Sequence, residues 1–415
     1  MKNIFIKNIT LIDGTKANIL IAKGKFQSIT KVDDSNEILN DIPNVKLIDG
    51  NGKAIIPAFY NAHTHAAMTL LRSYSEDKIL QKWLSDVWKK EATLTETDIY
   101  NGTRLAIVEM IRSGSVFFAD MYWHHSAIIK AAKDMGVRVN AGITFMDSLD
   151  KKTQNTNMEF IKNYIPDDMI NISVAPHAVY TCNKNLYKEC YKVAENRNFM
   201  LQTHLCETEQ EVNDCLSKYN LTPVEFLDDV GVLNSNTVAA HCVHLTEKDA
   251  DILAKRGVKV VHNPCSNMKL ASGIFPYSLH KKAGTSIILG TDGCASNNSL
   301  SMLEEMKFAA LLAKVSTNNP VSLPAEEVFQ WATMDSAAVF GLKAGKIEEG
   351  FLADCLLINL NHVSLVPNNN LIASLVYSAE SECIDSVICN GNLLMENRYM
   401  EKEEEIIDIL KHKTI

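Results

Sequence analysis

Ile55-Ile56-Pro57-Ala58-Phe59-Tyr60-Asn61-Ala62-His63-Thr64-His65 is an apolar run, rich in branched and aromatic residues, that ends in two histidines. Such a run predicts a β-strand that is buried on both faces. Because side chains alternate along a strand, His63 and His65 point to the same side and can bind one ion. A His-x-His pattern alone is weak evidence of a metal site, and its position at the end of a strand strengthens it.

The composition is that of an ordinary globular protein. The chain has 415 residues, with 46% hydrophobic and 22% charged residues, which suits a large α/β barrel with an appendage. A net charge of −9 leaves no basic surface for nucleic acid or an anionic membrane. No apolar run reaches membrane-spanning length, and the N-terminus does not read as a signal peptide. Ten cysteines without a CxxC pair predict reduced thiols in a cytoplasmic protein.

From residue 54 onward, apolar strand patterns alternate with amphipathic helix patterns. Eight strand candidates cover residues 54–63, 115–122, 138–145, 171–178, 200–205, 237–243, 258–262 and 285–291. Alternating strands and helices with eight strands favour an α/β fold of the (β/α)₈ barrel type. An open doubly wound sheet is the alternative, and the positions of the polar residues favour the barrel.

The two ends of the chain have a different character from the middle. Residues 1–53 contain short strand patterns with turns at Gly14 and Gly24, and β-like runs return after Gly350. We therefore predict that both ends build one small β-sandwich around the barrel. The predicted segments are 1–53 for the first part of the sandwich, 54–345 for the barrel and 346–415 for the second part. A charged terminal helix, facing solvent, is expected from Glu401.

Five of the strand candidates end in side chains that bind metals or move protons: His63 and His65, His177, His204, His241, and Asp292. The carboxyl ends of barrel strands form one mouth, so these side chains are expected to meet there. Imidazoles with one carboxylate suit zinc, although iron or manganese could bind the same set. We predict one divalent metal held by His63, His65, His204 and Asp292. Residues 171–180 lack the Lys, Asp or Glu that would bridge a second ion.

Two further residues can move protons. Glu207 lies three residues after His204 and can reach water and substrate without binding the metal; the alternative is a surface Glu that begins the next helix. His241 can be a fifth ligand, a core residue or a partner that orients the attacking water, and we favour the last. Together these residues predict metal-assisted hydrolysis, in which the ion makes hydroxide available near neutral pH.

Several motifs make the chain similar to one superfamily. They are Pro57–His65, His204-x-x-Glu207, His241-Cys242-Val243-His244, His262-Asn263-Pro264-Cys265-Ser266-Asn267-Met268-Lys269-Leu270 and Gly290-Thr291-Asp292-Gly293. This set resembles the amidohydrolase superfamily, and the Gly345–Asp354 run resembles the junction where the barrel of that superfamily returns to its β-sandwich. The resemblance covers nearly the whole chain.

Within the superfamily, the chain is similar to the 5-methylthioadenosine/S-adenosylhomocysteine deaminases. The stretches that carry this resemblance are Met68–Arg72, Trp83-Leu84, Asp120–Tyr122, Pro176-His177 and Asp292–Ser299. The resemblance implies hydrolytic replacement of the adenine 6-amino group, with release of ammonia, at one zinc per subunit. It also implies that Glu207 protonates the ring nitrogen, while His241 and Asp292 hold and deprotonate the water.

The resemblance also assigns substrate-binding residues. Glu91 falls where the family binds the ribose hydroxyls, although a solvated Glu at a helix start is the alternative, and His177 would contact the ribose or the 5′ substituent. Family members that hold the S-adenosylhomocysteine carboxylate are expected to carry arginines after the third strand. Residues 141–147 contain none, and the next basic residues are Lys151 and Lys152. Since a mobile lysine holds a carboxylate less well than a bidentate arginine, we predict a neutral 5′ group, as in methylthioadenosine, 5′-deoxyadenosine or adenosine.

Two other functions stay open at this point. The first is another deaminase or hydrolase of the superfamily, acting on guanine, a triazine or a related heterocycle. The second is an inactive barrel scaffold, against which the retention of all four predicted ligands argues. The expected partner is a small purine nucleoside, with no nucleic acid and no membrane, and analogy with the family predicts a homo-oligomer.

Overall fold

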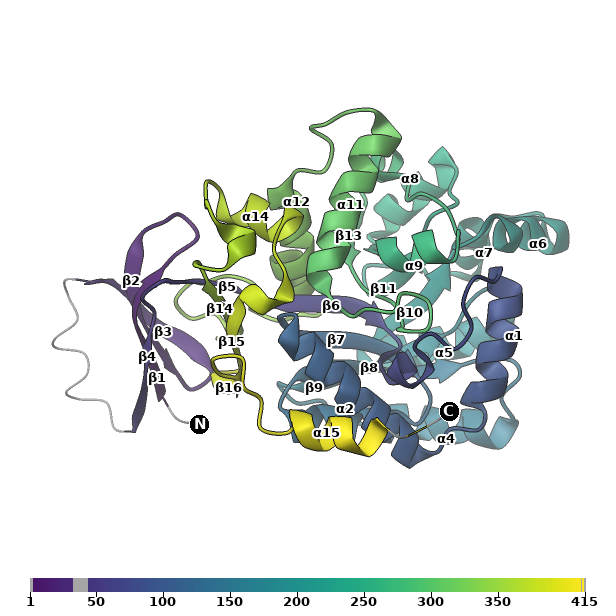
Figure 1. The fold of residues 1–415 in the computed structure, drawn as a ribbon. Coiled ribbons are helices and arrows are strands. Elements are labelled where there is room, and N and C mark those ends of the chain that lie inside the picture. The colour runs from purple at the N-terminus through teal and green to yellow at the C-terminus, as the bar shows by residue number, and fades with distance from the viewer. Residues whose placement is uncertain (1–2, 33–43, 412, 414–415) are drawn as a thin grey trace.

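A computed structural model describes residues 3–32, 44–411 and 413, and in them two sheets of eight strands each (Figure 1). Residues 1–2, 33–43, 412 and 414–415, which belong to the predicted sandwich segments, lie outside the described residues. One sheet is a parallel barrel, and the other is a mixed sheet beside it. The mixed sheet contains strands from both ends of the chain, which lie side by side in Figure 1.

The barrel sheet consists of eight strands in sequence order, with every neighbouring pair parallel. The backbone N–H groups of Thr291 and Asp292 donate to the carbonyl of His63 at 3.2 and 2.9 Å, which joins the end of the last strand to the first. The predicted (β/α)₈ barrel is confirmed in this nearly closed form. The strands are β6 (Phe59–Thr64), β7 (Ser115–Tyr122), β8 (Arg138–Phe145), β9 (Ile170–Pro176), β10 (Met200–Leu205), β11 (Thr237–His241), β12 (Lys259–His262) and β13 (Ser286–Leu289).

The helices of the barrel begin and end at residues with clear local signals. Thr95, Thr222 and Thr246 each accept a backbone N–H in a capping box, which satisfies free donors at the helix start. Gly231 and Gly257 end their helices in the left-handed conformation. The helices are α1 (Leu80–Glu91), α2 (Glu96–Arg112), α3 (His125–Met135), α4 (Lys151–Asn163), α5 (Lys184–Arg197), α6 (Glu209–Tyr219), α7 (Pro223–Val230), α8 (Glu247–Arg256), α9 (Pro264–Lys269), α10 (Tyr277–Ala283), α11 (Met302–Thr317), α12 (Ala325–Gln330), α13 (Ser336–Val339), α14 (Leu371–Tyr377) and α15 (Glu403–Leu410).

The mixed sheet has the order β16-β15-β14-β5-β1-β2-β3, with β4 paired to β1. β14 pairs antiparallel with β5, so that Leu356 lies opposite Ile56 and the two chain ends share one ladder. The strands are β1 (Asn3–Thr10), β2 (Lys16–Ala22), β3 (Lys25–Lys31), β4 (Val45–Asp49), β5 (Lys53–Pro57), β14 (Cys355–Asn359), β15 (Ile384–Cys389) and β16 (Asn392–Met395).

The first predicted barrel strand, 54–63, is two strands in the structure. β5 ends at Pro57 in the mixed sheet, and β6 begins at Phe59 in the barrel. Pro57 has no N–H to donate, and after it the Ala58 and Phe59 N–H groups donate to the carbonyls of Asp354 (3.1 Å) and Gly114 (2.9 Å). The prediction of one strand was wrong because both halves are apolar and buried on both faces, so their periodicity does not differ.

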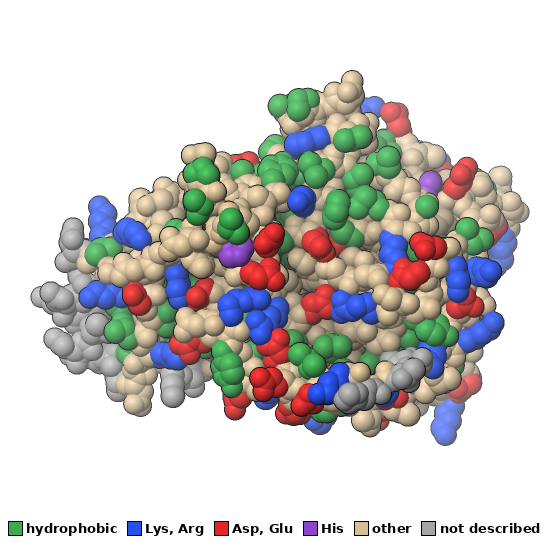
Figure 2. All heavy atoms as spheres, in the orientation of Figure 1, with side chains coloured by type: hydrophobic (Ala, Val, Ile, Leu, Met, Phe, Trp, Pro, Cys, Tyr) green, Lys and Arg blue, Asp and Glu red, His purple; other side chains and the backbone are tan. Residues whose placement is uncertain are grey.

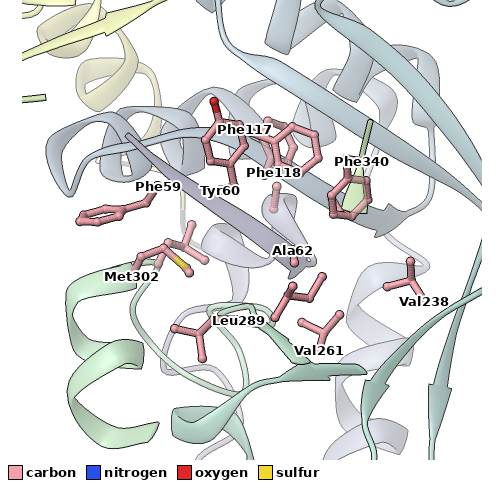
Figure 3. Packing of buried hydrophobic residues seen from close by; sticks show 14 of the residues in the cluster. Phe59, Tyr60, Ala62, Phe117, Phe118, Val238, Val261, Leu289, Met302 and Phe340 are labelled. Carbon is pink, nitrogen blue, oxygen red and sulfur yellow. The ribbon is translucent and has the colours of Figure 1, made fainter. Parts of the chain in front are cut away.

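Aromatic side chains fill the region between β6, β7 and the end of the barrel domain. Tyr60 and Phe117 pack with ring centroids 5.7 Å apart, and Phe117 lies 4.7 Å from Phe340 (Figure 3). Arg138, at the start of β8, makes a buried ion pair with Asp354, which in turn accepts the Tyr60 hydroxyl. These contacts lie at the end of the barrel where β8 begins, opposite the mouth at which the strands end.

The terminal helix α15 does not face solvent on all sides, as its charge had suggested. Glu405 pairs with Arg104 and Glu403 pairs with Arg112, both on α2, and Ile406 is buried. The prediction of a charged, solvated helix holds for most of its residues, which are exposed, and the ion pairs with α2 are the part that the sequence did not predict. Within residues 3–32, 44–411 and 413, no helix is long and apolar enough to cross a membrane.

Candidate metal centre and active site

Three imidazoles and one carboxylate meet at the carboxyl end of the barrel strands. His63 and His65 come from the end of β6, His204 from β10, and Asp292 from the segment after β13. The Nε2 atoms of His65 and His63 lie 3.2 and 3.6 Å from Asp292 Oδ1, and the Nε2 atoms of His65 and His204 lie 3.3 Å apart. The structure thus brings together the four predicted ligands.

The second nitrogens of two of these histidines determine which tautomer is present. His65 Nδ1 lies 2.5 Å from the Met121 carbonyl, and His204 Nδ1 lies 2.9 Å from the His177 carbonyl. A carbonyl only accepts, so each Nδ1 carries the proton and each Nε2 presents a lone pair to the centre. Burial lowers the pKa of His63 and His204 well below its usual value, so both are neutral near pH 7.

This arrangement fits a cation. Lone pairs on His65 and His204 face each other at 3.3 Å, close to the distance between two ligand nitrogens in a tetrahedral zinc site with bonds of about 2.0–2.1 Å. His63 Nε2 is buried without a hydrogen-bond partner among the described residues. The ligand atoms of His63, His65 and Asp292 lie within 4.8 Å of one another, as do those of His63, His204 and His241. The donor set fits one divalent ion.

Asp292 uses its two carboxylate oxygens differently. Oδ1 faces the imidazoles and accepts the Gly293 N–H at 2.9 Å, whereas Oδ2 accepts hydroxyls from the loops behind it. Burial would raise the pKa of Asp292, but the imidazoles of His65, His241 and His63 lower it to about 2. The carboxylate is therefore ionised over the whole physiological range.

His241 and Glu207 stand beside the predicted ligands. His241 Nε2 lies 3.9 Å from Glu207 Oε2, and His241 Nδ1 lies 2.8 Å from Asn267 Oδ1. Burial would lower the pKa of His241, but the carboxylates of Glu207 and Asp292 raise it above its usual value. Glu207 is only 5% exposed, and its Oε1 accepts the Ser272 hydroxyl at 3.0 Å. The alternative of a surface Glu207 is therefore excluded.

The backbone at these strand ends adopts left-handed conformations. The φ angles of His241 and Asp292 are 75° and 62°, and Cys206, next to Glu207, has a φ of 51°. Such angles are unfavourable for residues other than glycine and persist only where the surroundings impose them. Here they turn the side chains of successive strands toward one centre.

Glu91 and His177 lie on one side of this centre. Glu91 is the last residue of α1 and is 8% exposed, so the alternative of a solvated Glu at a helix start is wrong: the helix folds back over the barrel mouth. Its Oε1 has no hydrogen-bond partner among the described residues, and burial raises the pKa of the carboxyl to about 7. His177 is half-buried, 6.3 Å from Trp88 between ring centroids, and its Nδ1 lies 3.0 Å from the Thr181 hydroxyl.

A large cavity continues outward from Glu91. Its volume is about 760 Å³, and its walls include Trp88, Trp123, Met146 and Phe160. No Lys or Arg is among the described residues that line it. Lys151 is one of the first two basic residues after the segment 141–147. Its Nζ lies 3.5 Å from Gln154 Oε1 and 3.7 Å from Glu189 Oε2. The described lining therefore offers no Lys or Arg to pair with a carboxylate.

Ser272 and Asn267 are among the residues that contact the site and were not predicted from the sequence. Ser272 donates to Glu207, and Asn267 contacts His241. Asn267 lies inside the His262–Leu270 motif, so that motif marked its region without giving it a role. Ser272 carries no signal, because a single serine after a short helix is common in any sequence.

Comparison with known proteins agrees with this geometry. The model of the amidohydrolase family matches residues 54–394. The chain belongs to the amidohydrolase family. It is 40% identical to the 5′-deoxyadenosine deaminase of Methanosphaera stadtmanae over 98% of the chain and 97% of that protein. It is 42% identical to 5-methylthioadenosine/S-adenosylhomocysteine deaminase 1 of Archaeoglobus fulgidus over 95% of the chain and 96% of that protein.

A solved structure extends the comparison. The adenosine deaminase of Xanthomonas campestris, crystallised with bound zinc, is 28% identical and superimposes with a TM-score of 0.90, covering 99% of the chain and 98% of that protein. The resemblance to the amidohydrolases inferred from the motifs is confirmed, and with it the barrel and a metal-dependent hydrolytic centre as features of the family.

Proposed function

We propose that this amidohydrolase removes the 6-amino group of adenine in 5′-modified adenosines by hydrolysis. The observation that carries the proposal is the centre formed by His63, His65, His204 and Asp292 with Glu207 buried beside it. The names of the relatives at about 40% identity support adenosine-like substrates. A bound divalent ion, with zinc as the best fit, would supply the Lewis acidity that makes water a nucleophile near neutral pH.

The residues of the chain then have distinct roles. His241 and Asp292 hold the attacking water and take its proton, because both point into the centre and Asp292 is ionised. Glu207 gives a proton to the ring nitrogen next to the carbon that is attacked, while Ser272 holds its other oxygen. The amino group leaves as ammonia, so that one water is consumed and one carbonyl is formed.

Glu91 and His177 bind the sugar in this proposal. Glu91 lines the cavity, and its carboxylate, whose Oε1 has no hydrogen-bond partner among the described residues, can accept hydroxyl hydrogens of the ribose. The 5′ substituent then enters the cavity of about 760 Å³, whose described walls carry no Lys or Arg. A neutral substituent loses less solvation there than a carboxylate, so methylthioadenosine, 5′-deoxyadenosine and adenosine are the preferred substrates.

A substrate panel with ammonia detection tests the proposal. The zinc-loaded protein should deaminate 5′-deoxyadenosine and methylthioadenosine with a kcat/KM at least tenfold above that for S-adenosylhomocysteine. Guanine and a triazine serve as the rival substrates within the family. Faster turnover of either rival would replace the proposed substrate, and no turnover of any compound by metal-loaded protein would favour an inactive scaffold.

We also infer that the protein is a homo-oligomer. Phe308, Leu311 and Val315 form an exposed apolar stripe on α11, with 37%, 41% and 77% of their surface accessible. Hydrophobic side chains gather over this helix in Figure 2. Light scattering during gel filtration should give a mass above that of one chain, and the substitutions Leu311→Glu and Val315→Glu should lower it. A monomeric unaltered protein would contradict the inference.

Two further assignments remain proposals. All ten cysteines are free thiols, and all but Cys265 are buried, which supports residence in the reducing cytoplasm. The two sheets support the division into segments 1–53, 54–345 and 346–415, except that β5 (Lys53–Pro57) belongs to the mixed sheet, so the first four residues of the proposed barrel segment lie in that sheet. Limited proteolysis that released a stable 54–345 fragment would support that division, and cleavage within it would argue against it.

A further inference from the structure

Two sequence motifs form loops around Asp292, and Asp292 is the only predicted metal ligand in either of them. The positions of these loops suggest a second role for the motifs. The Asn263–Leu270 segment contains α9, and the Gly293–Ser299 segment follows Asp292. Each places one serine against the same carboxylate oxygen. Ser266 donates to Asp292 Oδ2 at 2.6 Å, and Ser296 lies 3.0 Å from the same atom. The Ser296 hydroxyl also lies 3.1 Å from the Gly293 carbonyl, so Ser266 is the stronger donor.

One buried acid holds both loops. Glu305, on α11, is fully buried and has one oxygen for each loop. Its Oε2 accepts the backbone N–H of Cys265 at 3.2 Å, and its Oε1 accepts the side-chain amide of Asn297 at 2.6 Å. Cys265 directly precedes Ser266, and Asn297 directly follows Ser296. Glu305 thus fixes the spacing between the two serines.

We propose that Ser266 and Ser296, held by Glu305, are positioning residues that turn Asp292 so that only Oδ1 faces the imidazoles that would hold the metal. The terminal torsion of an aspartate is soft, so an unrestrained carboxylate can present either oxygen or both. Hydroxyl donors on Oδ2 remove that freedom, and short bonds to an ionised acceptor are strong. This inference rests on the metal site of the proposed function, and it concerns residues outside the predicted ligands and substrate contacts.

Zinc affinity, measured on the full-length apoprotein by competition with a chromophoric chelator, tests this directly. Loss of a residue that orients a ligand typically weakens metal binding about 10–100-fold. The Ser266→Ala/Ser296→Ala double variant should bind zinc at least tenfold more weakly, and its cobalt-loaded form should show an altered visible spectrum. Ser299→Ala is the matched control, since Ser299 lies in the same loop and accepts the Ser301 N–H at 3.2 Å.

Glu305→Gln tests the connection between the loops. Glutamine can accept only one of the two N–H groups that Glu305 accepts, so this variant should weaken zinc binding about tenfold in the unaltered background. In the double serine variant, Glu305→Gln should weaken zinc binding by less than a further factor of two, because Glu305 acts on Asp292 only by way of the two serines. If the losses of zinc affinity from Glu305→Gln and from the double serine substitution were additive, Glu305 would have only a packing role, and the proposal that it holds the two serines would be overturned.

Melting temperature and zinc affinity together distinguish a folding defect, a failure of the proposed function and a loss of the positioning role. A variant is counted as folded, and its zinc affinity is compared, only if its melting temperature lies within a few degrees of that of the unaltered protein. If the double variant does not fold, the single variants Ser266→Ala and Ser266→Thr are compared, since threonine keeps the hydroxyl. Ser266→Ala should then bind zinc more weakly than Ser266→Thr, and equal zinc affinities would overturn the proposal. If the unaltered chain binds no zinc, the proposed function fails. If it binds zinc and the serine variants bind it equally well, only the positioning role fails.

Discussion

Glu207 is held in place by its own neighbours and not by the predicted metal ligands. Ser272 donates to one carboxylate oxygen, and the other faces His241 Nε2 at 3.9 Å. The backbone N–H of Glu207 donates to Glu211 Oε2 at 2.9 Å, which fixes the main chain at the end of β10. Substitution of Glu207 by a residue of the same size should therefore leave the ligands undisturbed.

Glu207→Gln is expected to keep zinc and to lose most of its turnover. The substitution preserves size but removes the ionisable proton, and general acid–base groups contribute about 10²–10⁴-fold to the rate. Elemental analysis and kcat for methylthioadenosine measure the two effects. Glu209→Gln, at an exposed position two residues away, is the control and should retain full activity. A kcat within threefold of the unaltered protein would remove Glu207 from the mechanism.

Glu91 should make substrate binding dependent on pH. Burial raises the pKa of its carboxyl to about 7, so the fraction of charged carboxylate falls as the pH drops from 8 to 6. The charged form accepts ribose hydroxyls better, and KM for adenosine should therefore rise toward low pH, by up to tenfold per unit below the pKa.

The matched controls for this pH effect are a substrate and a variant. With 2′,3′-dideoxyadenosine, which lacks the ribose hydroxyls, KM should not follow the Glu91 titration. Glu91→Gln should raise KM for adenosine about 10–100-fold, the loss of a charge-assisted hydrogen bond, and should leave a flat profile. A pH dependence that survives in Glu91→Gln would assign it to another group.

At the scale of elements, the mixed sheet and the barrel are joined at Pro57 and at the start of β8. Arg138 donates to both oxygens of Asp354 at 2.8 and 3.2 Å, with both side chains almost completely buried. The Tyr60 hydroxyl and the Asn390 N–H donate to the same carboxylate. The group therefore connects β6 and β8 of the barrel to the chain segment that leads into β14.

Asp354→Ala should destabilise the protein by about 3–5 kcal/mol, because it leaves the guanidinium of Arg138 buried without a counterion. Urea unfolding followed by circular dichroism measures the change in the free energy of unfolding. Glu159→Gln is the control, since its partner Lys162 and Glu159 itself are more than half exposed, and such pairs contribute about 0–1 kcal/mol. Equal effects of the two substitutions would show that the buried pair does not hold the sheets together.

For the whole molecule, metal removal should lower stability as well as abolish activity. The centre joins residues from β6, β10 and the segment after β13, and a ligand present at 100 times its Kd stabilises the native state by about 2.7 kcal/mol. Treatment with a chelator should lower Tm, and added zinc should restore both Tm and turnover. A Tm that does not change on full removal of zinc would mean that the ion does not bind at this centre.

Local sequence patterns were sufficient to predict most of the fold and the set of candidate metal ligands. Eight apolar runs predicted the barrel strands, and His63, His65, His204 and Asp292 were predicted as ligands because each lies at or just after the end of such a run. A barrel brings all strand ends to one mouth, so position along the chain translates into position in space. That is why distant residues could be assigned to one site.

Only the tertiary structure decided the features that depend on contacts between segments far apart in the sequence. The burial of Glu91, the Ser272 bond to Glu207 and the link from Glu305 to the two serine loops all depend on how segments pack over the barrel mouth. The break between β5 and β6 depends on which sheet each half joins. Serine, glutamate and apolar residues are common everywhere, and their roles follow from the neighbours that packing gives them, which no local pattern records.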